Sequence, residues 1–286
     1  MHKIYNFKLS ELLFILLPLF LIAGPFLSDL SVSLITLIFL FNFKKETHIK
    51  YFKNIYFYFF LIFNIWIITS SLFSNNVAES LHTSFFYFRF YVFSLAVWFI
   101  LDTHEQVLKY FFYSLLLAFA ILVLDGFFQY TYGSNILGWP LHPGPRISSF
   151  FKDELILGSY LSRLFPILFG LLIFLKFDKK FYYGFGLLFV LIECLTFLSG
   201  ERSAFFYINL SAIFMIIMLK GIKLFRFSIW LFSFILIIFI SNISDSTRFR
   251  MIDHTIEQTG LSGKESEKYI FSEQHQDHYI SALKMF

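Results

Sequence analysis

The sequence predicts an all-α protein, a polytopic transmembrane helical bundle, and two observations carry this prediction. The first is composition: 58% of the 286 residues are hydrophobic and only 15% are charged, whereas about 25% of the residues in a soluble domain are charged. The second is the arrangement of the apolar residues, which form long runs between short polar connections. A helix of about 20 apolar residues crosses a bilayer core of roughly 30 Å. The mean hydropathy of +0.71 agrees with this class.

The apolar runs predict about nine spans, at residues 11–24, 27–42, 54–73, 84–101, 109–130, 155–175, 181–198, 203–219 and 226–241. The first two runs would together form a helix of about 32 residues, and its length of roughly 48 Å is too great for one crossing. Gly24 and Pro25 interrupt the pattern where a turn is needed, which places Asp29 at head-group level. We therefore expect a transmembrane domain over residues 1–241 and the start of a large polar loop over residues 242–286.

The positions of the basic residues predict the orientation. They are concentrated in the N-terminal segment and in three connections, which all lie on one side if the nine runs cross the membrane. Positive connections mark the cytoplasmic side, so residues 242–286 are expected on the opposite side. The connection around Asp102 is slightly acidic and gives no information. The basic residues concerned are Lys3, Lys8, Lys44, Lys45, Lys50, Lys53, Lys176, Lys179, Lys180, Lys220, Lys223 and Arg226.

The polar segment at 242–286 differs from the rest of the chain. It holds five Lys or Arg residues and seven Asp or Glu residues. Residues 272–286 have a helical pattern in which Tyr279, Leu283 and Phe286 share one face. The chain ends at Phe286 without a helix stop signal, and we interpret it as C-terminally truncated.

Ionisable residues inside the predicted spans are the first candidates for a functional site, because charges are costly in a bilayer. Arg89, Asp125, Arg163 and Glu193 each lie about five to eight residues below the outer end of a span, which is roughly 8–12 Å. None of these lies near the inner surface. This one-sided distribution favours an anionic ligand at the outer leaflet, since the planar fork of arginine binds phosphate through two hydrogen bonds. The alternative is that these four residues pair with one another and only stabilise the bundle.

Several classes of function are disfavoured by the sequence. The chain has no P-loop, and no Asp-x-Asp pair that would clamp a metal–diphosphate complex. Its basic residues lie between apolar runs, where they indicate orientation rather than a nucleic-acid surface. The single cysteine, Cys194, rules out a disulfide framework within the chain. A transferase on the outer side has no nucleotide supply, so its donor would already be activated on a lipid. The diphosphate of such a donor would lie at the level of these arginines.

Two histidines near the C-terminus, His275 and His278, give less specific signals. Their spacing suits a zinc site, but no third ligand is evident, so we expect no metal. A neutral imidazole near pH 7 accepts a proton from a hydroxyl group, which makes a general base the sharper hypothesis. A solvated loop histidine is the alternative that the spacing alone favours.

Several segments resemble the bacterial family of O-antigen ligases and O-antigen polymerases, which are membrane glycosyltransferases of lipopolysaccharide biosynthesis. LLPLFLIAGPFLSDLSVSL resembles the first two spans of that family, and RISSFFKDELILGSYLSRLFP at 146–166 resembles its arginine-bearing loop. FLSGERSAFF at 197–206 resembles its Ser-x-x-Arg-Ser turn. HQDHYISALKMF resembles the histidine-bearing stretch at the end of its long periplasmic loop. The segments occur in the family's order and are distributed along most of the chain, from residue 16 to residue 286.

The resemblance implies a multi-pass enzyme of the bacterial inner membrane whose active face is periplasmic. O-antigen glycan would pass from undecaprenyl diphosphate to the lipid A-core acceptor with inversion, and no metal, nucleotide or other cofactor would be needed. Arg146 and Arg202 fall on the family's loop arginines and would hold the diphosphate, with Arg250 as a further contact. His278 falls on the loop histidine and would activate the acceptor. The chain departs from the family pattern because it stops after this histidine, where the family continues with further spans.

Two alternatives remain open at this point. An O-antigen polymerase would join repeat units, so its acceptor would be another glycan. A transporter or flippase of lipid-linked sugars would need charged or broken-helix features near the midplane, and the sequence shows none there. With Arg89 and Arg163 included, the expected substrate-binding set is Arg89, Arg146, Arg163, Arg202 and Arg250.

Overall fold

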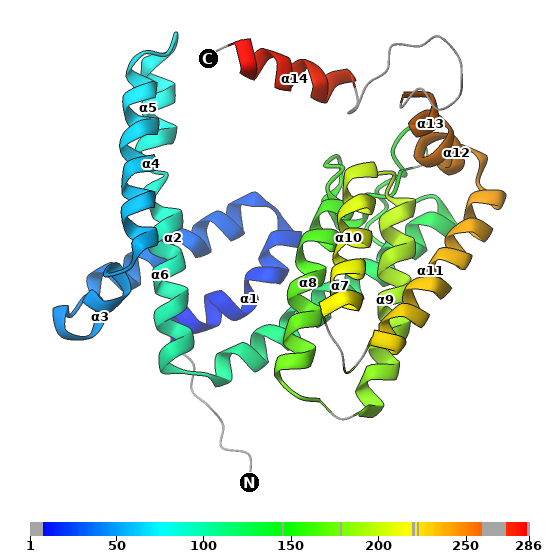
Figure 1. The fold of residues 1–286 in the computed structure, drawn as a ribbon, viewed down its shortest axis with the longest axis horizontal. Helices are drawn as coiled ribbons and strands as arrows, with labels where there is room; N and C mark the ends of the chain where they lie inside the picture. The colour runs from blue at the N-terminus through cyan, green and yellow to red at the C-terminus, as the bar shows by residue number, and fades with distance from the viewer. Residues whose placement is uncertain are drawn as a thin grey trace. The chain divides into compact units, whose positions relative to one another are not determined.

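The computed structural model describes residues 8–144, 146–177, 179–218, 221, 223–258 and 273–284. Within these ranges the secondary structure is helical apart from two isolated β-bridges, which confirms the all-α prediction. The chain divides into two compact units, residues 1–118 (unit 1) and residues 119–286 (unit 2). The long helix α7, Gln106–Tyr132, belongs to both units (Figure 1).

Unit 1 begins with a helical hairpin. Helix α1, Leu9–Ala23, ends at Gly24, whose φ of +125° is a conformation that side chains with a Cβ rarely adopt. Pro25 then occupies the first position of α2, where its missing N–H costs nothing. The predicted break at Gly24 and Pro25 is therefore confirmed. The remaining helices of unit 1 are α3 Lys45–Phe52, α4 Ile55–Leu72, α5 Val77–Phe85 and α6 Phe88–Thr103, and α2 ends at Phe41.

Polar contacts join several connecting segments at one end of unit 1. We call this end the lysine end. The Glu11 carboxylate lies 2.9 Å from Nδ1 of His104. The Lys50 ammonium lies 3.1 Å from the Asp102 carboxylate. The start of α1, helix α3 and the end of α6 therefore share this end. This arrangement agrees with the placement of the N-terminal segment and the 42–54 connection on one side of the membrane.

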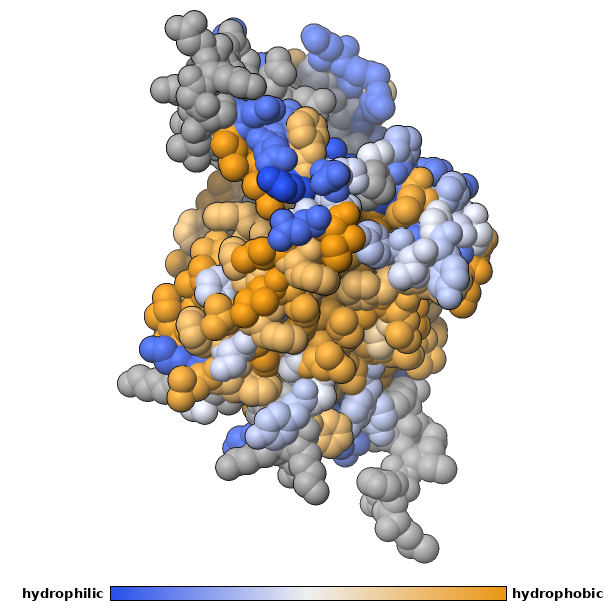
Figure 2. Space-filling view, turned by 90° about the vertical axis from the view of Figure 1, so that its right-hand side faces the viewer, coloured by the Kyte–Doolittle hydropathy of each residue, from blue (hydrophilic) through white to orange (hydrophobic). Residues whose placement is uncertain are grey.

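Unit 2 is built from the second half of α7 and four long helices, α8 Leu157–Phe174, α9 Lys179–Leu198, α10 Arg202–Met218 and α11 Lys223–Ile243. Helix α10 packs on α8, and α11 packs on α9. The face that carries α9 and α11 is a broad apolar band with polar residues at its two ends (Figure 2). Exposed apolar side chains of α11 include Leu224, Phe232, Ile235 and Phe239. Such a band is expected where lipid, not water, is the solvent.

Five helical segments are long and apolar enough to cross a membrane: 55–72, 77–103, 106–132, 157–174 and 223–243. Four shorter apolar helices cover 9–23, 25–41, 183–198 and 202–218. Every apolar run identified in the sequence falls on one of these helices. The protein is therefore a helical protein with membrane-spanning character. That all nine helices cross remains a prediction.

Short elements follow α11 in the polar segment. They are α12 Asp245–Arg248, the π-helical turn η3 Phe249–Asp253 and α13 His254–Gln258. The helix predicted over 272–286 corresponds to α14, Glu273–Lys284. Phe286, which was expected on its apolar face, lies outside the described residues. A short 3₁₀ turn, η1 Ser149–Phe151, precedes α8.

The predicted orientation is open to a labelling test. In a background with Cys194→Ser, a cysteine at Asp153 should react with a membrane-impermeant maleimide in intact spheroplasts, because the loop before α8 is expected outside. A cysteine at Lys45, at the lysine end, should react only after permeabilisation. Both native side chains are exposed, so accessibility in each case reports the side of the membrane. The reverse pattern would overturn the orientation.

Candidate functional site

The turn between α9 and α10 is the centre of the candidate site. Gly200 adopts a φ of +71°, a conformation that favours glycine. A Cβ at this position would lie 3.0 Å from Nε of Arg250 and 3.2 Å from Cγ of Arg146. Both contacts are closer than most side-chain packing allows. Glycine is therefore needed twice here, for the backbone conformation and for the approach of two arginine side chains.

Three arginines surround this turn and form what we call the arginine cluster: Arg146, Arg202 and Arg250. Nε of Arg146 donates to the carbonyl of Ser199 at 3.2 Å. Nε of Arg250 donates to the carbonyl of Gly200 at 2.9 Å. Arg202 is the first residue of α10, and its charge interacts with that of Arg250. Arg146, Arg202 and Arg250 are far apart in the sequence but lie at the same end of unit 2. We call this end the arginine end.

Two members of the arginine cluster, Arg146 and Arg250, carry positive charge that no close carboxylate of the described residues pairs with. Burial lowers the pKa of the Arg146 guanidinium, the positive charge of Arg250 lowers it further, and the Glu201 carboxylate partly opposes both effects. Arginine nevertheless stays protonated in proteins. No carboxylate of the described residues lies within ion-pair distance of Arg146 or Arg250. An anion bound here would relieve this repulsion.

The Glu201 carboxylate forms its hydrogen bonds with the start of α8. Its carboxylate accepts hydrogen bonds from the backbone N–H of Gly158 at 2.6 Å and of Ser159 at 3.0 Å, and from the Ser159 hydroxyl at 2.6 Å. These groups form the start of α8, where an acidic side chain caps free N–H groups and favours the helix dipole. Glu201 therefore ties the α9–α10 turn to α8.

A buried polar network fixes the loop that carries Arg146. The Asp125 carboxylate accepts from the Ile136 N–H at 2.9 Å and from the Ser149 hydroxyl at 2.5 Å. Oε1 of Gln129 accepts from the N–H groups of Ser148 and Ser149, at 3.1 and 2.7 Å. Asp125 and Gln129 are both buried on α7. Asp125, which the sequence placed among the candidate ligand residues, thus positions the loop.

His142 is a candidate that the sequence reading did not single out. It pairs with Arg146 in an antiparallel β-bridge, with N···O distances of 3.2 and 3.4 Å between their backbones. Side chains of directly opposed residues project to the same face of such a bridge. Nε2 of His142 is buried and has no hydrogen-bond partner among the described residues. The sequence feature that could have identified His142 is the Pro- and Gly-rich stretch GWPLHPGPR, because it predicts a tight turn that folds the chain back on itself.

Among the described residues, no hydrogen bond or ion pair joins Arg163 or His278 to the arginine cluster, and Arg89 belongs to unit 1. Arg89, in unit 1, forms an ion pair with Asp29 at 2.6 Å. Arg163 lies six residues after the start of α8 with an exposed side chain. His278 is exposed on α14, and residues 259–272, which connect α14 to α13, lie outside the described ranges. The side chain of His275 also lies outside them.

Arg226 corrects two expectations from the sequence. It was assigned to a basic connection, yet it lies within α11, is fully buried and forms an ion pair with Glu193 of α9. Its guanidinium also lies 5.2 Å from the ring centre of Phe165 and 5.8 Å from that of Phe189. The alternative in which Glu193 pairs with Arg89, Arg163 or Asp125 also differs from the structure, because the partner of Glu193 is Arg226.

Comparison of the chain with models of known protein families, with curated protein sequences and with solved structures finds no match. The assignment of a function therefore depends on the site geometry and on the resemblance of the segments quoted above.

The buried pair of Glu193 and Arg226 predicts a specific stability pattern. Arg226→Met alone should lower the free energy of unfolding by about 3–5 kcal/mol, because it leaves the Glu193 carboxylate buried without a partner. The double variant Glu193→Leu/Arg226→Met should recover most of this loss. Thermal unfolding in detergent measures the stability of the single variant and of the double variant. If the double variant is as unstable as the single one, the two charges do not act as a pair.

Proposed function

We propose that this protein transfers a glycan from a lipid-linked diphosphate donor to an acceptor hydroxyl at the membrane surface, as an O-antigen ligase does. The observation that carries the proposal is the arginine cluster at the turn between α9 and α10. Arg146 and Arg202 are the two arginines that the segment resemblance assigned to the diphosphate, and they lie near Arg250 around one glycine.

The hydrogen bonding of the cluster supports this ligand chemistry. Arg146 and Arg250 use Nε to hold carbonyl oxygens of the turn, and their terminal amino groups make no hydrogen bond within the described residues. A diphosphate offers oxygens spaced for such forks, and guanidinium groups bind them without losing charge. In the proposal the arginines neutralise the diphosphate, so that neither a metal ion nor a nucleotide is required.

The proposed reaction is a single displacement. The acceptor hydroxyl oxygen attacks the anomeric carbon and forms the new C–O bond, while the bond from that carbon to the diphosphate oxygen breaks. Undecaprenyl diphosphate leaves with the bonding electrons, and its charge is stabilised by the arginine cluster. The hydroxyl proton passes to the neutral imidazole of His278, or to that of His142 if α14 does not bring His278 to the site. The configuration at the anomeric carbon is inverted.

The identity of the acceptor distinguishes the two enzymatic alternatives, a ligase and a polymerase. The lipid A-core oligosaccharide is the proposed acceptor, and another glycan repeat unit would make the protein an O-antigen polymerase. A transporter of lipid-linked sugars is the candidate from another class, and one observation favours it: Glu193 and Arg226 place charges inside the bundle, with Oε2 of Glu193 and two nitrogens of Arg226 unpartnered among the described residues. Transfer in detergent without a membrane separates enzyme from transporter.

Arg202→Lys should lower kcat/KM for glycan transfer about tenfold to a hundredfold, because lysine keeps the charge but loses the fork. The assay contains purified lipid-linked glycan and lipid A-core acceptor, without ATP or metal. Arg248→Lys is the matched control, since Arg248 lies outside the cluster and its guanidinium lies 3.9 Å from the Asp253 carboxylate, and it should reduce transfer less than threefold. Equal losses in the two variants would show that the cluster is not the diphosphate site.

His278→Ala should reduce transfer by roughly 10²–10⁴-fold, as expected when a general base is removed, while expression and membrane insertion stay normal. His275→Ala should have a milder effect, because the resemblance supports only the second histidine. His142→Ala, measured in the same assay, tests the histidine beside Arg146. Wild-type transfer by the His278 variant together with loss in the His142 variant would move the general base to the loop before α8.

A further inference from the structure

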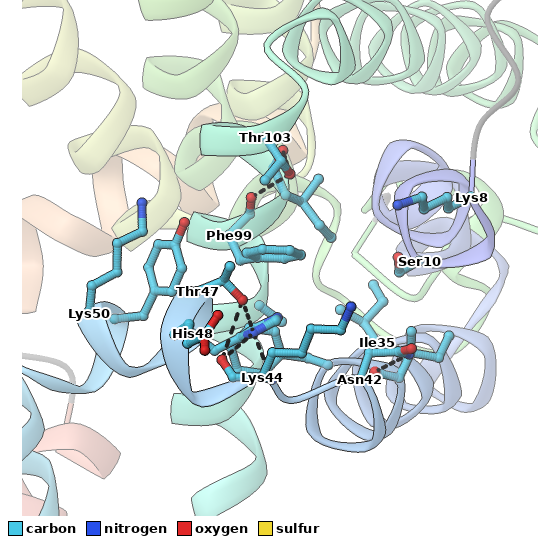
Figure 3. A pocket seen from close by; sticks show the side chains of 16 residues that line it. Lys8, Ser10, Ile35, Asn42, Lys44, Thr47, His48, Lys50, Phe99 and Thr103 are labelled. Atoms are coloured by element: carbon cyan, nitrogen blue, oxygen red, sulfur yellow. Dashed lines mark hydrogen bonds between the residues drawn. The ribbon is translucent and has the colours of Figure 1, made fainter.

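Unit 1 contains a cavity of about 670 Å³ at its lysine end (Figure 3). The start of α1, the end of α2, helix α3 and the last turns of α6 enclose it. Its volume falls within the range of about 300–1,000 Å³ that is typical of small-molecule sites. Nothing in the proposed transfer reaction uses it.

The deep part of the cavity is apolar. Ile35, Phe39, Ala96 and Ile100 line it and are almost fully buried. The ring of His48 is also buried and lies against the ring of Phe99, with ring centres 4.5 Å apart and the ring planes tilted by 32°. Nδ1 of His48 lies 3.0 Å from the backbone nitrogen of Lys44, so this ring fixes the start of α3. Such a lining suits a hydrocarbon chain.

The mouth of the cavity is basic. Lys8 and Lys44 extend their side chains toward the space between α1 and α3 from opposite sides (Figure 3). Neither forms an ion pair with a carboxylate of the described residues, whereas Lys50 is paired with Asp102. Glu46 is the one acidic residue of the lining. Two unpaired ammonium groups against one carboxylate favour an anionic group.

Exposed apolar residues beside the mouth indicate where the occupant comes from. Phe41 and Phe43 flank the lining residue Asn42 and are 84% and 40% exposed, and Leu9, next to Lys8, is 59% exposed. Side chains of this kind lie in the bilayer rather than in water. A cavity with an apolar interior, a basic mouth and an apolar rim therefore opens toward lipid at head-group level.

We infer that this cavity binds an anionic membrane phospholipid, with its phosphate between Lys8 and Lys44 and part of one acyl chain against Ile35, Phe39 and Ala96. The predicted orientation makes this a lipid of the cytoplasmic leaflet. The inference is independent of the proposed transfer reaction, which is assigned to the arginine end of unit 2.

The test titrates purified protein with phosphatidylglycerol in detergent micelles and counts bound lipid by native mass spectrometry. Lys8→Gln and Lys44→Gln should each weaken binding about fivefold, and the double variant about 25-fold, because each lysine contributes a similar attraction to an anionic head group. Lys45→Gln is the matched control. Lys45 is exposed and adjacent to Lys44 but does not line the cavity, so its loss should change affinity less than twofold.

A second variant tests the apolar part. Ile38 lines the cavity and is only partly buried, so Ile38→Trp should occupy the cavity and abolish binding without lowering the unfolding temperature. Phosphatidylcholine should bind at least tenfold more weakly than phosphatidylglycerol.

Three outcomes would overturn the inference. Equal losses in Lys44→Gln and Lys45→Gln would indicate diffuse attraction to the protein surface. Equal binding of phosphatidylcholine would show that head-group charge is not recognised. Competition by millimolar inorganic phosphate, with no effect of Ile38→Trp, would indicate a site for a free anion.

Discussion

The carboxylate of Glu201 holds the arginine end of unit 2 together. It accepts three hydrogen bonds from Gly158 and Ser159 at the start of α8. Glu201 also follows Gly200 in the sequence, and the backbone carbonyl of Gly200 accepts a hydrogen bond from Nε of Arg250. The tight approach depends on a second glycine, because a Cβ on Gly158 would lie 2.5 Å from the Ser199 hydroxyl oxygen. Without this connection, the turn that seats the arginines would have no fixed position relative to α8.

The role of this carboxylate is consistent with the unpaired charges of Arg146 and Arg250 among the described residues. A glutamate that caps a helix satisfies backbone N–H groups and cannot also form a close ion pair with every nearby arginine. Arg146 and Arg250 are anchored instead by neutral carbonyl oxygens, which fix their direction and leave their charge in place. The carbonyl oxygens therefore position the two guanidinium groups without neutralising their charge. This arrangement is what a site for an external anion requires, because an internal carboxylate would compete with the ligand.

The sequence predicted the helices well and the contacts between them less well. Apolar runs and the Gly24–Pro25 break depend on local composition, and both correspond to observed elements. Arg226 was misassigned because it lies three residues inside α11, where the sequence resembles the end of a basic connection, and its partner Glu193 is 33 residues away. Likewise, the sequence marked Asp125 as a buried charge but could not show that backbone N–H groups, rather than an arginine, satisfy it. Long-range pairing is set by helix packing, which composition does not encode.

The lysine end of unit 1 and the arginine end of unit 2 differ in the chemistry of their side chains. At the lysine end of unit 1, Lys8 and Lys44 are exposed, and strongly hydrated ammonium groups at a lipid interface attract anionic head groups without a fixed geometry. At the arginine end of unit 2, Arg146 is partly buried and its Nε is fixed to a backbone carbonyl. A guanidinium tolerates this desolvation because its charge is delocalised and weakly hydrated, and its planar fork then has a defined direction. Selective recognition of a diphosphate needs that direction, whereas retention of a membrane lipid needs only charge beside an apolar cavity. The choice of arginine in unit 2 and lysine in unit 1 therefore agrees with the proposed transfer site in unit 2 and the proposed lipid site in unit 1.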